Sequence, residues 1–331
     1  MSRASNLLPA ATVAVPVSCS RKRNRRLAIL AVLLALTAVG VARLLRDPTP
    51  HFVARRSSLA NVVADSAVVE EGYVLEPLRL TAASGLAVNM LVRRAVADTG
   101  RRNLPLAVIL GGHYTGRQAA RLLGPTPGVV VAAMSYPYDG NPKPDALTFL
   151  KDIPRIRQAF LDTPPAISLA LDYLLERPEV DHQRVEAIGV SLGAPFVCIA
   201  GALDKRFTRV WALHGSGGSY TPLEVQMRRE IPFGPARVVA AALANLIIDG
   251  PRLDPVRWVG QISPRPFVMV NASDDERLPR SAIESLYASA REPKELVWME
   301  GAHIHADKET IQRLLSIVMS RMTDSSSGQT R

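Results

Sequence analysis

Residues 189–193 read GVSLG, the G-x-S-x-G pattern that places a serine on a sharp turn between a strand and a helix. The apolar run 185–190 predicts the strand, and the run 194–203 (APFVCIAGAL) predicts the helix. On such a turn the serine hydroxyl projects from the edge of a sheet, and the helix start supplies positive potential and the N–H of Leu192. The context favours a nucleophilic Ser191 over a passive serine in a glycine-rich turn.

A serine hydroxyl needs a neighbouring base before it becomes a good nucleophile. Two of the six histidines, His303 and His305, lie in the segment GAHIH directly after the last predicted strand. His214 ends another predicted strand, where we expect it to pack at the strand edge. The residues leave His303 and His305 open as the base.

A carboxylate would hold the imidazole of that base in the productive tautomer and stabilise its charged form. The loop 271–279 (NASDDERLP) follows the penultimate predicted strand and offers three acids in a row, Asp274, Asp275 and Glu276. We expect one of the three to orient the base and the other two to be solvated.

The stretch 177–197 (RPEVDHQRVEAIGVSLGAPFV) resembles the α/β-hydrolase superfamily, in its dienelactone-hydrolase, acetyl-xylan-esterase and prolyl-oligopeptidase-like branch. The resemblance extends over about residues 73–322. Its acid pattern, D-x-x-[V/I/L]-P, selects Asp275, and its G-x-H pattern selects His303, with His305 as the alternative. The resemblance thus implies a catalytic triad of Ser191, Asp275 and His303, in the superfamily's serine–acid–histidine order.

An oxyanion formed at the substrate carbonyl needs two N–H donors. Leu192 is the expected first donor. The loop 111–114 reads GGHY where members of the superfamily often carry His-Gly-x, so we expect the N–H of His113 as the second donor. This departure from the family pattern leaves the register open by one residue.

The elements that must position these residues alternate short apolar runs with helical stretches. A hairpin is expected over 73–80 and 86–95, and strands over 106–110, 129–134, 185–190, 210–213, 267–270 and 296–299. Helices are expected over 117–123, 153–161, 166–176, 192–203, 281–290 and 308–322, with Pro164-Pro165 as a break. The pattern predicts an α/β fold, with a mostly parallel central sheet covered by helices on both faces and a small helical cap over 221–259.

The charge of the chain is concentrated at its N-terminus. The chain carries 40 Lys and Arg against 30 Asp and Glu, and the first 56 residues account for +9 of the net +10. The rest of the chain is nearly neutral, which argues against a nucleic-acid binder. Residues 21–26 (RKRNRR) directly precede an uncharged apolar run, 27–42, which is typical of a membrane flank.

We therefore expect one N-terminal transmembrane helix over 27–45 that acts as an uncleaved signal anchor, if Arg43 reaches the interface. The positive-inside rule places the N-terminus in the cytoplasm and the body on the extracytoplasmic side. A cleaved signal peptide with a secreted body is the alternative, since small residues at 40–42 suit a peptidase.

The expected organisation is a basic N-terminus (1–26), the anchor (27–45), a tether (46–65), the hydrolase domain (66–322) with its cap (221–259), and a disordered tail (323–331). The expected activity is hydrolysis of a small carboxylic ester through an acyl-enzyme, with no metal or other cofactor. A peptidase or thioesterase on the same triad is one alternative, and a non-catalytic membrane-tethered binding domain is another. The sequence leaves the substrate and the oligomeric state open.

Overall fold

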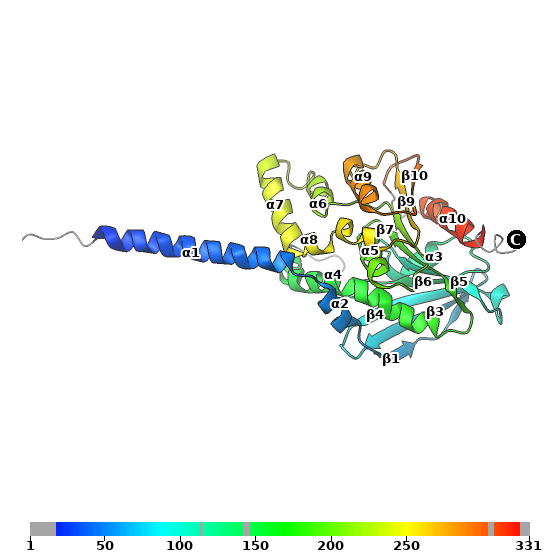
Figure 1. Cartoon of the computed structure of the whole chain (residues 1–331). Helices are drawn as coiled ribbons and strands as arrows, with labels where there is room; N and C mark the ends of the chain where they lie inside the picture. The colour runs from blue at the N-terminus through cyan, green and yellow to red at the C-terminus, as the bar shows by residue number, and fades with distance from the viewer. Residues whose placement is uncertain (1–17, 113–114, 142–145, 304–307, 325–331) are drawn as a thin grey trace, which may run out of the picture. The chain divides into compact units, whose positions relative to one another are not determined.

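The computed structural model describes residues 18–112, 115–141, 146–303 and 308–324 of the 331-residue chain (Figure 1). The chain divides into two compact units, Met1–Arg46 and Asp47–Arg331, which we describe separately.

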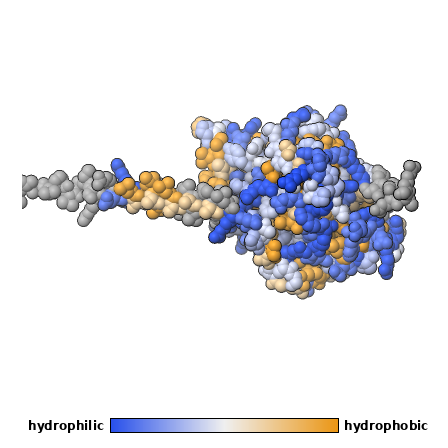
Figure 2. All heavy atoms as spheres, viewed as in Figure 1, coloured by the Kyte–Doolittle hydropathy of each residue, from blue (hydrophilic) through white to orange (hydrophobic). Residues whose placement is uncertain are grey.

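The first unit contains one described helix, α1 (Ser18–Leu45). Its side chains Leu27, Ile29, Leu30, Val32 and Leu34 are exposed, and Figure 2 shows apolar residues as a band along part of the helix. Within the described residues, no helix has both the length and the apolar character needed to cross a membrane. The helix also includes the basic block 21–26, and the transmembrane span expected over 27–45 stays a prediction. The predicted membrane sidedness depended on that span and stays a prediction.

The second unit is built on a ten-stranded sheet with strand order β1-β3-β4-β6-β5-β7-β8-β9-β10, and β2 (Val68–Glu70) pairs with β3. The predicted hairpin is present as β3 (Tyr73–Ala82) and β4 (Ala87–Ala95). Strands β5 to β10 run parallel to their neighbours within that group. Their bounds are β5 (Leu104–Leu110), β6 (Val130–Met134), β7 (Val180–Val190), β8 (Arg209–Leu213), β9 (Phe267–Ala272) and β10 (Lys294–Met299). The mostly parallel sheet expected from the apolar runs is confirmed.

Helices cover both faces of this sheet. In β5, Leu106 and Val108 belong to one buried apolar cluster and Ala107 and Ile109 to a second, because alternate residues of a strand face opposite sides. The first cluster includes residues of α4 (Ala146–Leu175), α5 (Gly193–Leu203) and α9 (Arg280–Ser289). The second includes residues of α3 (Ala119–Leu122) and α10 (Lys308–Asp324). The two clusters fix the sheet between two helical layers.

The segment predicted as a tether, 46–65, belongs largely to the folded unit. It forms α2 (Thr49–Arg56) and strand β1 (Leu59–Ala64), and β1 pairs antiparallel with β3. Phe52 is buried in the first apolar cluster, and the guanidinium of Arg55 donates to both oxygens of Asp162 at 2.8 and 2.7 Å. The tether prediction was wrong because these contacts join residues about a hundred positions apart, which the local polar composition does not reveal.

Helix α4 runs through Pro164 and Pro165, where the sequence predicted a break between two helices. Each proline removes a backbone donor and costs about 3 kcal/mol in a helix interior. The Thr163 hydroxyl donates to the carbonyl oxygen of Ala159 at 2.7 Å, and the residues on both sides of the prolines are buried. Burial of this long apolar face therefore outweighs the two lost hydrogen bonds.

The segment predicted as a cap lies between β8 and β9 and forms three helices (Figure 1). They are α6 (Tyr220–Gln226), α7 (Gly234–Ile247) and α8 (Gly250–Leu253). Helix α7 exposes large apolar side chains, among them Phe233 at its start and Leu243 in its interior. Residues of α6, of α8 and of the end of α7 line the cavity described below.

Two glycines let α5 approach the sheet closely. A Cβ atom at Gly189 would lie 2.4 Å from Val197 Cγ2 and 2.6 Å from the Gly193 carbonyl oxygen, and one at Gly193 would lie 2.1 Å from the Leu110 carbonyl oxygen. These neighbours are largely backbone atoms that cannot turn away. The glycines of the GVSLG segment are therefore a steric requirement for packing α5 on β5 and β7.

We expect Gly189→Ala to lower the free energy of unfolding by about 1–3 kcal/mol, because the added methyl overpacks this contact. Gly124→Ala is the matched control, since a Cβ there would meet only Gln312 Cγ at 3.7 Å, and its change should stay within about 0.5 kcal/mol. Urea unfolding of both variants measures the difference. Equal stability of the two variants would refute the steric account.

Candidate active site

Ser191 lies on the turn between β7 and α5 with a φ of +52°. The left-handed region is costly for a residue with a side chain, so the surrounding contacts must hold the turn. Its N–H donates to the Leu213 carbonyl at 2.8 Å, and its carbonyl accepts the N–H of Ala194 at 3.0 Å. The elbow predicted from the glycine pattern is present, and it is fixed by the neighbouring strand β8.

Four neighbouring strands each deliver one polar residue at the same edge of the sheet. Ser191 follows β7, His214 follows β8, Asp275 lies in the loop after β9, and His303 follows β10. These strands are adjacent and parallel, so their carboxyl ends meet at one edge. The parallel order therefore assembles residues that lie up to 112 positions apart in sequence.

The three residues that the resemblance selected lie in one hydrogen-bonded chain. Ser191 Oγ is 2.9 Å from His303 Nε2, and His303 Nδ1 is 2.7 Å from Asp275 Oδ2. The side chains of His303 and Asp275 are 2% and 1% exposed, so water does not compete strongly for these bonds. The geometry lets the imidazole accept the serine proton at Nε2 while the carboxylate holds Nδ1.

Asp275 accepts hydrogen bonds from two histidines and two backbone groups. Its Oδ2 lies 2.7 Å from His303 Nδ1 and 3.3 Å from His214 Nδ1, and its Oδ1 accepts the N–H groups of Arg277 at 2.9 Å and Leu278 at 2.8 Å. Burial by itself would raise the pKa of Asp275, but the bonds from the two histidines outweigh burial and hold that pKa below its ordinary value. Asp275 is thus a carboxylate that can only accept, which requires both Nδ1 atoms to carry hydrogen.

His214 is the site residue that the sequence reasoning missed. It was expected to pack at the strand edge, and instead its ring lies 5.0 Å from the His303 ring in an edge-to-face arrangement and bonds to Asp275. Its φ is +48°, and its N–H donates to the Val270 carbonyl at 2.7 Å. Burial lowers the pKa of His214, against the raising effect of the Asp275 bond. One feature of the sequence could have identified His214 as a site residue. It directly follows the strand that comes after the elbow strand along the chain.

The other two acids of the predicted loop lie outside this chain of bonds. Asp274 accepts the Ser273 hydroxyl at 2.8 Å in an exposed position. Glu276, expected to be solvated, accepts the backbone N–H of His303 at 2.9 Å, and this bond outweighs burial and lowers the pKa of Glu276. Glu276 therefore fixes the backbone of the loop that carries His303.

The two predicted oxyanion donors have different outcomes. Leu192 directly precedes α5 and follows Ser191, so its N–H lies at the positive end of that helix. His113 and the alternative base His305 lie outside the described residues. Gly112, the last described residue of the first loop, faces the elbow, since a Cβ built on it would lie 4.0 Å from Ser191 Cβ.

The sequence showed no cluster with metal-ligand spacing, but among the described residues the fold brings together one candidate. One ligand atom each from His214, Asp275 and His303 lies within 4.8 Å of the others. These atoms are already joined by the hydrogen bonds given above, which satisfy the buried carboxylate without an ion. The cluster is therefore accounted for by its own bonds.

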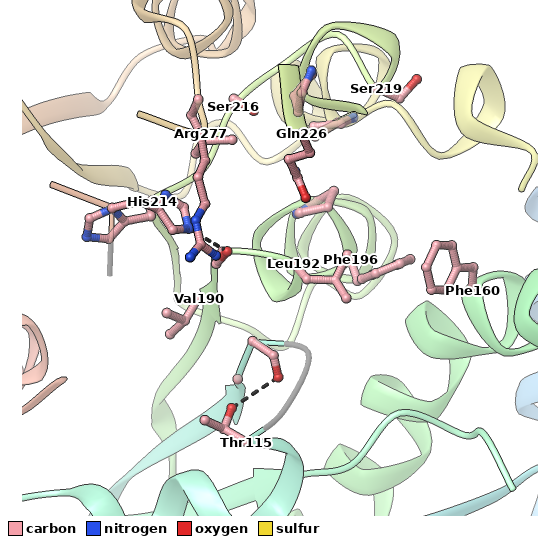
Figure 3. A pocket seen from close by; sticks show the side chains of 18 of the residues that line it. Thr115, Phe160, Val190, Leu192, Phe196, His214, Ser216, Ser219, Gln226 and Arg277 are labelled. Carbon is pink, nitrogen blue, oxygen red and sulfur yellow. Dashed lines mark hydrogen bonds between the residues drawn. The ribbon is translucent and has the colours of Figure 1, made fainter. Parts of the chain in front are cut away.

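Ser191 and His303 line a cavity of about 910 Å³. One side is apolar, where Leu192 and Phe196 meet Phe160 of α4, whose ring centroid lies 5.4 Å from that of Phe196 (Figure 3). Polar side chains also line the cavity, among them Ser216, Ser219, Gln226 and Arg277. A cavity of this size, with few polar groups converging on a nucleophile, is typical of a small-molecule site.

Comparison with known sequences gives distant matches. No family model matches the chain. The uncharacterized protein YfhR of Salmonella typhi is 29% identical over 148 residues, which is 41% of this chain and 46% of that protein. The protein of the same name in Escherichia coli K12 is 27% identical over 139 residues, 41% of this chain and 44% of that one. The match thus spans less than half the length of these relatives.

Solved structures match over more of the chain. An acetyl xylan esterase from Paenibacillus sp. R4 aligns with a TM-score of 0.57 and 18% identity, over 82% of this chain and 90% of that one. The methylesterase BT1017 aligns with a TM-score of 0.57 and 17% identity, over 88% of this chain and 68% of that one. An acetyl xylan esterase from Thermoanaerobacterium sp. JW/SL YS485 gives a TM-score of 0.58 at 14% identity, over 84% of this chain and 94% of that one. The chain therefore has the α/β-hydrolase fold, as the resemblance around the GVSLG segment implied.

Proposed function

We propose that this protein is a serine hydrolase that cleaves a carboxylic ester. The observation that carries the proposal is the hydrogen-bonded chain Ser191–His303–Asp275, whose serine and histidine line one cavity. The carboxylate fixes the tautomer that leaves His303 Nε2 free of hydrogen. The likeness of the fold to acetyl xylan esterases and a methylesterase supports an ester as the substrate.

In the first half of the proposed reaction, Ser191 Oγ attacks the acyl carbon while His303 Nε2 takes its proton. The negative charge that develops on the carbonyl oxygen is stabilised by the N–H of Leu192 and by the positive end of α5. The predicted second donor is the N–H of His113. His303 then gives its proton to the departing alcohol oxygen, which leaves an ester between Ser191 and the acyl group.

In the second half, a water molecule takes the place of the alcohol. His303 Nε2 accepts a proton from this water as it attacks the acyl carbon, and then returns a proton to Ser191 Oγ. Asp275 stays ionised throughout, because four donors hold its charge. The products are a carboxylic acid and an alcohol, and the enzyme is restored.

We infer a positioning role for His214 in this site. It bonds to the same Asp275 oxygen as His303 and packs edge-on against the His303 ring. The carboxylate therefore keeps its orientation when His303 becomes charged, since a second donor and two backbone N–H groups hold it in place. His214 also lines the cavity, and its positioning role runs through its bond to Asp275.

We expect Ser191→Ala to lower kcat for p-nitrophenyl ester hydrolysis by roughly 10⁴- to 10⁶-fold, since the nucleophile is removed and only binding and oxyanion stabilisation remain. Ser285→Ala, on the exposed side of α9, is the matched control and should retain full activity. A fluorophosphonate probe should label the parent and the control and fail to label Ser191→Ala. Undiminished hydrolysis by Ser191→Ala would rule out Ser191 as the nucleophile.

The same assay separates the ester from other acyl substrates. Thioesters and p-nitroanilides of the same acyl group place sulfur or nitrogen where the ester has oxygen. Faster turnover of either compound than of the ester would favour the thioesterase or peptidase alternative. Failure of every compound, together with failure of the probe, would favour a non-catalytic domain.

We expect His214→Gln to flatten the pH dependence of stability between pH 7 and 5. Burial lowers the pKa of His214 in the folded chain. When the pH drops below the ordinary histidine pKa of about 6.5, the unfolded chain therefore takes up a proton that the folded chain does not, and the free energy of unfolding decreases. The titration of Asp275 contributes only below about pH 4, because its pKa is also lowered. Urea unfolding at pH 7, 6 and 5 should show the larger loss in the parent, and equal losses would refute a neutral, buried His214.

A further inference from the structure

We propose that the acyl group of the substrate is an apolar chain longer than butyryl, attached to a more polar alcohol. This inference rests on the proposed function and adds the substrate class to it. It is carried by the cavity around Ser191, where Leu192, Phe196 and Phe160 form an apolar wall on one side, and His214, Ser216 and Arg277 lie on the other (Figure 3).

The direction of the reaction decides which part of the ester lies on which side. His303 Nε2 must reach the leaving oxygen to protonate it, so the alcohol lies on the His303 side of Ser191. The acyl carbon is bonded to the oxygen that develops negative charge, and the Leu192 N–H is the expected donor to that oxygen. With the alcohol oxygen on the His303 side and the carbonyl oxygen at the Leu192 N–H, the acyl chain takes the remaining direction, away from His303.

That direction follows an apolar wall. The Leu192 side chain leads to Phe196 on the next turn of α5, and Phe196 packs edge-on against Phe160 of α4 at a centroid distance of 5.4 Å (Figure 3). Phe196 packs in turn against Tyr136, whose hydroxyl donates to the Gly111 carbonyl, so the polar atom of Tyr136 is already hydrogen-bonded. The wall thus offers carbon atoms to a bound chain.

The cap closes this side with further apolar groups. Leu223 of α6, Ile248 after α7 and Leu253 of α8 line the same cavity. An acetyl group would leave most of the roughly 910 Å³ unfilled, whereas ligand sites of about 300–1,000 Å³ hold molecules the size of a fatty-acyl ester. An unfilled apolar wall contributes nothing to transition-state binding, so a longer acyl chain uses contacts that acetate cannot reach.

Polar groups gather on the other side of Ser191. His214 and Ser216 follow β8, and Arg277 lies two residues after Asp275 at the rim of the cavity (Figure 3). The Glu276 carboxylate lies 3.5 Å from Arg277 Nε and bonds to the His303 backbone, which places this polar group beside His303. An alcohol with hydroxyl groups of its own suits these surroundings better than an alkyl alcohol does.

The test compares p-nitrophenyl acetate, butyrate, hexanoate and octanoate with the full chain, at concentrations where each ester is monomeric. Each methylene buried in an apolar site contributes up to about fourfold in binding. We expect kcat/KM for octanoate to exceed that for acetate by at least tenfold. A preference for acetate, with Ser191-dependent hydrolysis intact, would overturn this inference and leave the proposed function standing.

Two substitutions at Phe160 test the wall itself. Phe160→Gln puts an amide on the proposed path of the chain and should lower the octanoate-to-acetate ratio of kcat/KM at least fivefold. Phe160→Leu is the matched apolar control and should keep the ratio within twofold of the parent. A ratio unchanged by Phe160→Gln would overturn the assignment of this wall, and if Phe160→Gln fails to fold, the chain-length series of the parent still decides the inference.

A second series separates failure of the inference from failure of the function. If the parent hydrolyses none of the esters and Ser191 takes no fluorophosphonate label, the proposed function and this inference fall together. If Ser191 is labelled and acetate is the best substrate, only the apolar acyl class is wrong. Comparison of glyceryl monooctanoate with octyl octanoate tests the alcohol side, where faster turnover of octyl octanoate would overturn the polar-alcohol part.

Discussion

The buried carboxylate of Asp275 is the group on which the rest of the site depends. A charge at this depth is tolerated only when hydrogen bonds replace its hydration. The replacement donors come from His214, His303 and the backbone of Arg277 and Leu278. The bonds join the loops after β8, β9 and β10, so one carboxylate fixes three loops and the tautomers of two histidines. Loss of that charge would leave two buried imidazoles without their shared acceptor.

The second constraint is steric and concerns the elbow. Helix α5 must lie close enough to β5 and β7 for Ser191 to project from the sheet edge, and only glycine at 189 and 193 leaves the room. The left-handed backbone of Ser191 is held by the bond from its N–H to Leu213. His214, which directly follows Leu213 in sequence, has a left-handed backbone as well. Two strained residues thus adjoin one another at neighbouring strand ends, where the sheet ladder and the buried core can hold them.

The two corrections within the folded unit share one cause. The polar segment after Arg46 and the pair Pro164-Pro165 both signal irregular structure by local rules. The polar segment packs against the folded unit through Phe52 and the Arg55–Asp162 pair. The proline pair stays helical because the apolar face of its helix is buried against the sheet. In each case contacts with distant parts of the chain outweighed a local preference of a few kcal/mol. The strands were easier to predict, because a fully apolar run of five or six residues has few other uses in a soluble domain.

The sequence by itself determined the strand–turn–helix around Ser191, the parallel sheet, and the positions of Asp275 and His303 after the last two strands, because these depend on short-range patterns and on a resemblance carried by local motifs. Only the tertiary structure decided that His214 shares the Asp275 carboxylate and that Glu276 holds the His303 backbone. It also decided that Leu192, Phe196 and Phe160 form an apolar wall on one side of Ser191, with Ser216 and Arg277 on the other. The physical reason is that these features are contacts between segments tens of residues apart, and side-chain direction at a strand end is set by packing across neighbouring strands rather than by the residues that precede it.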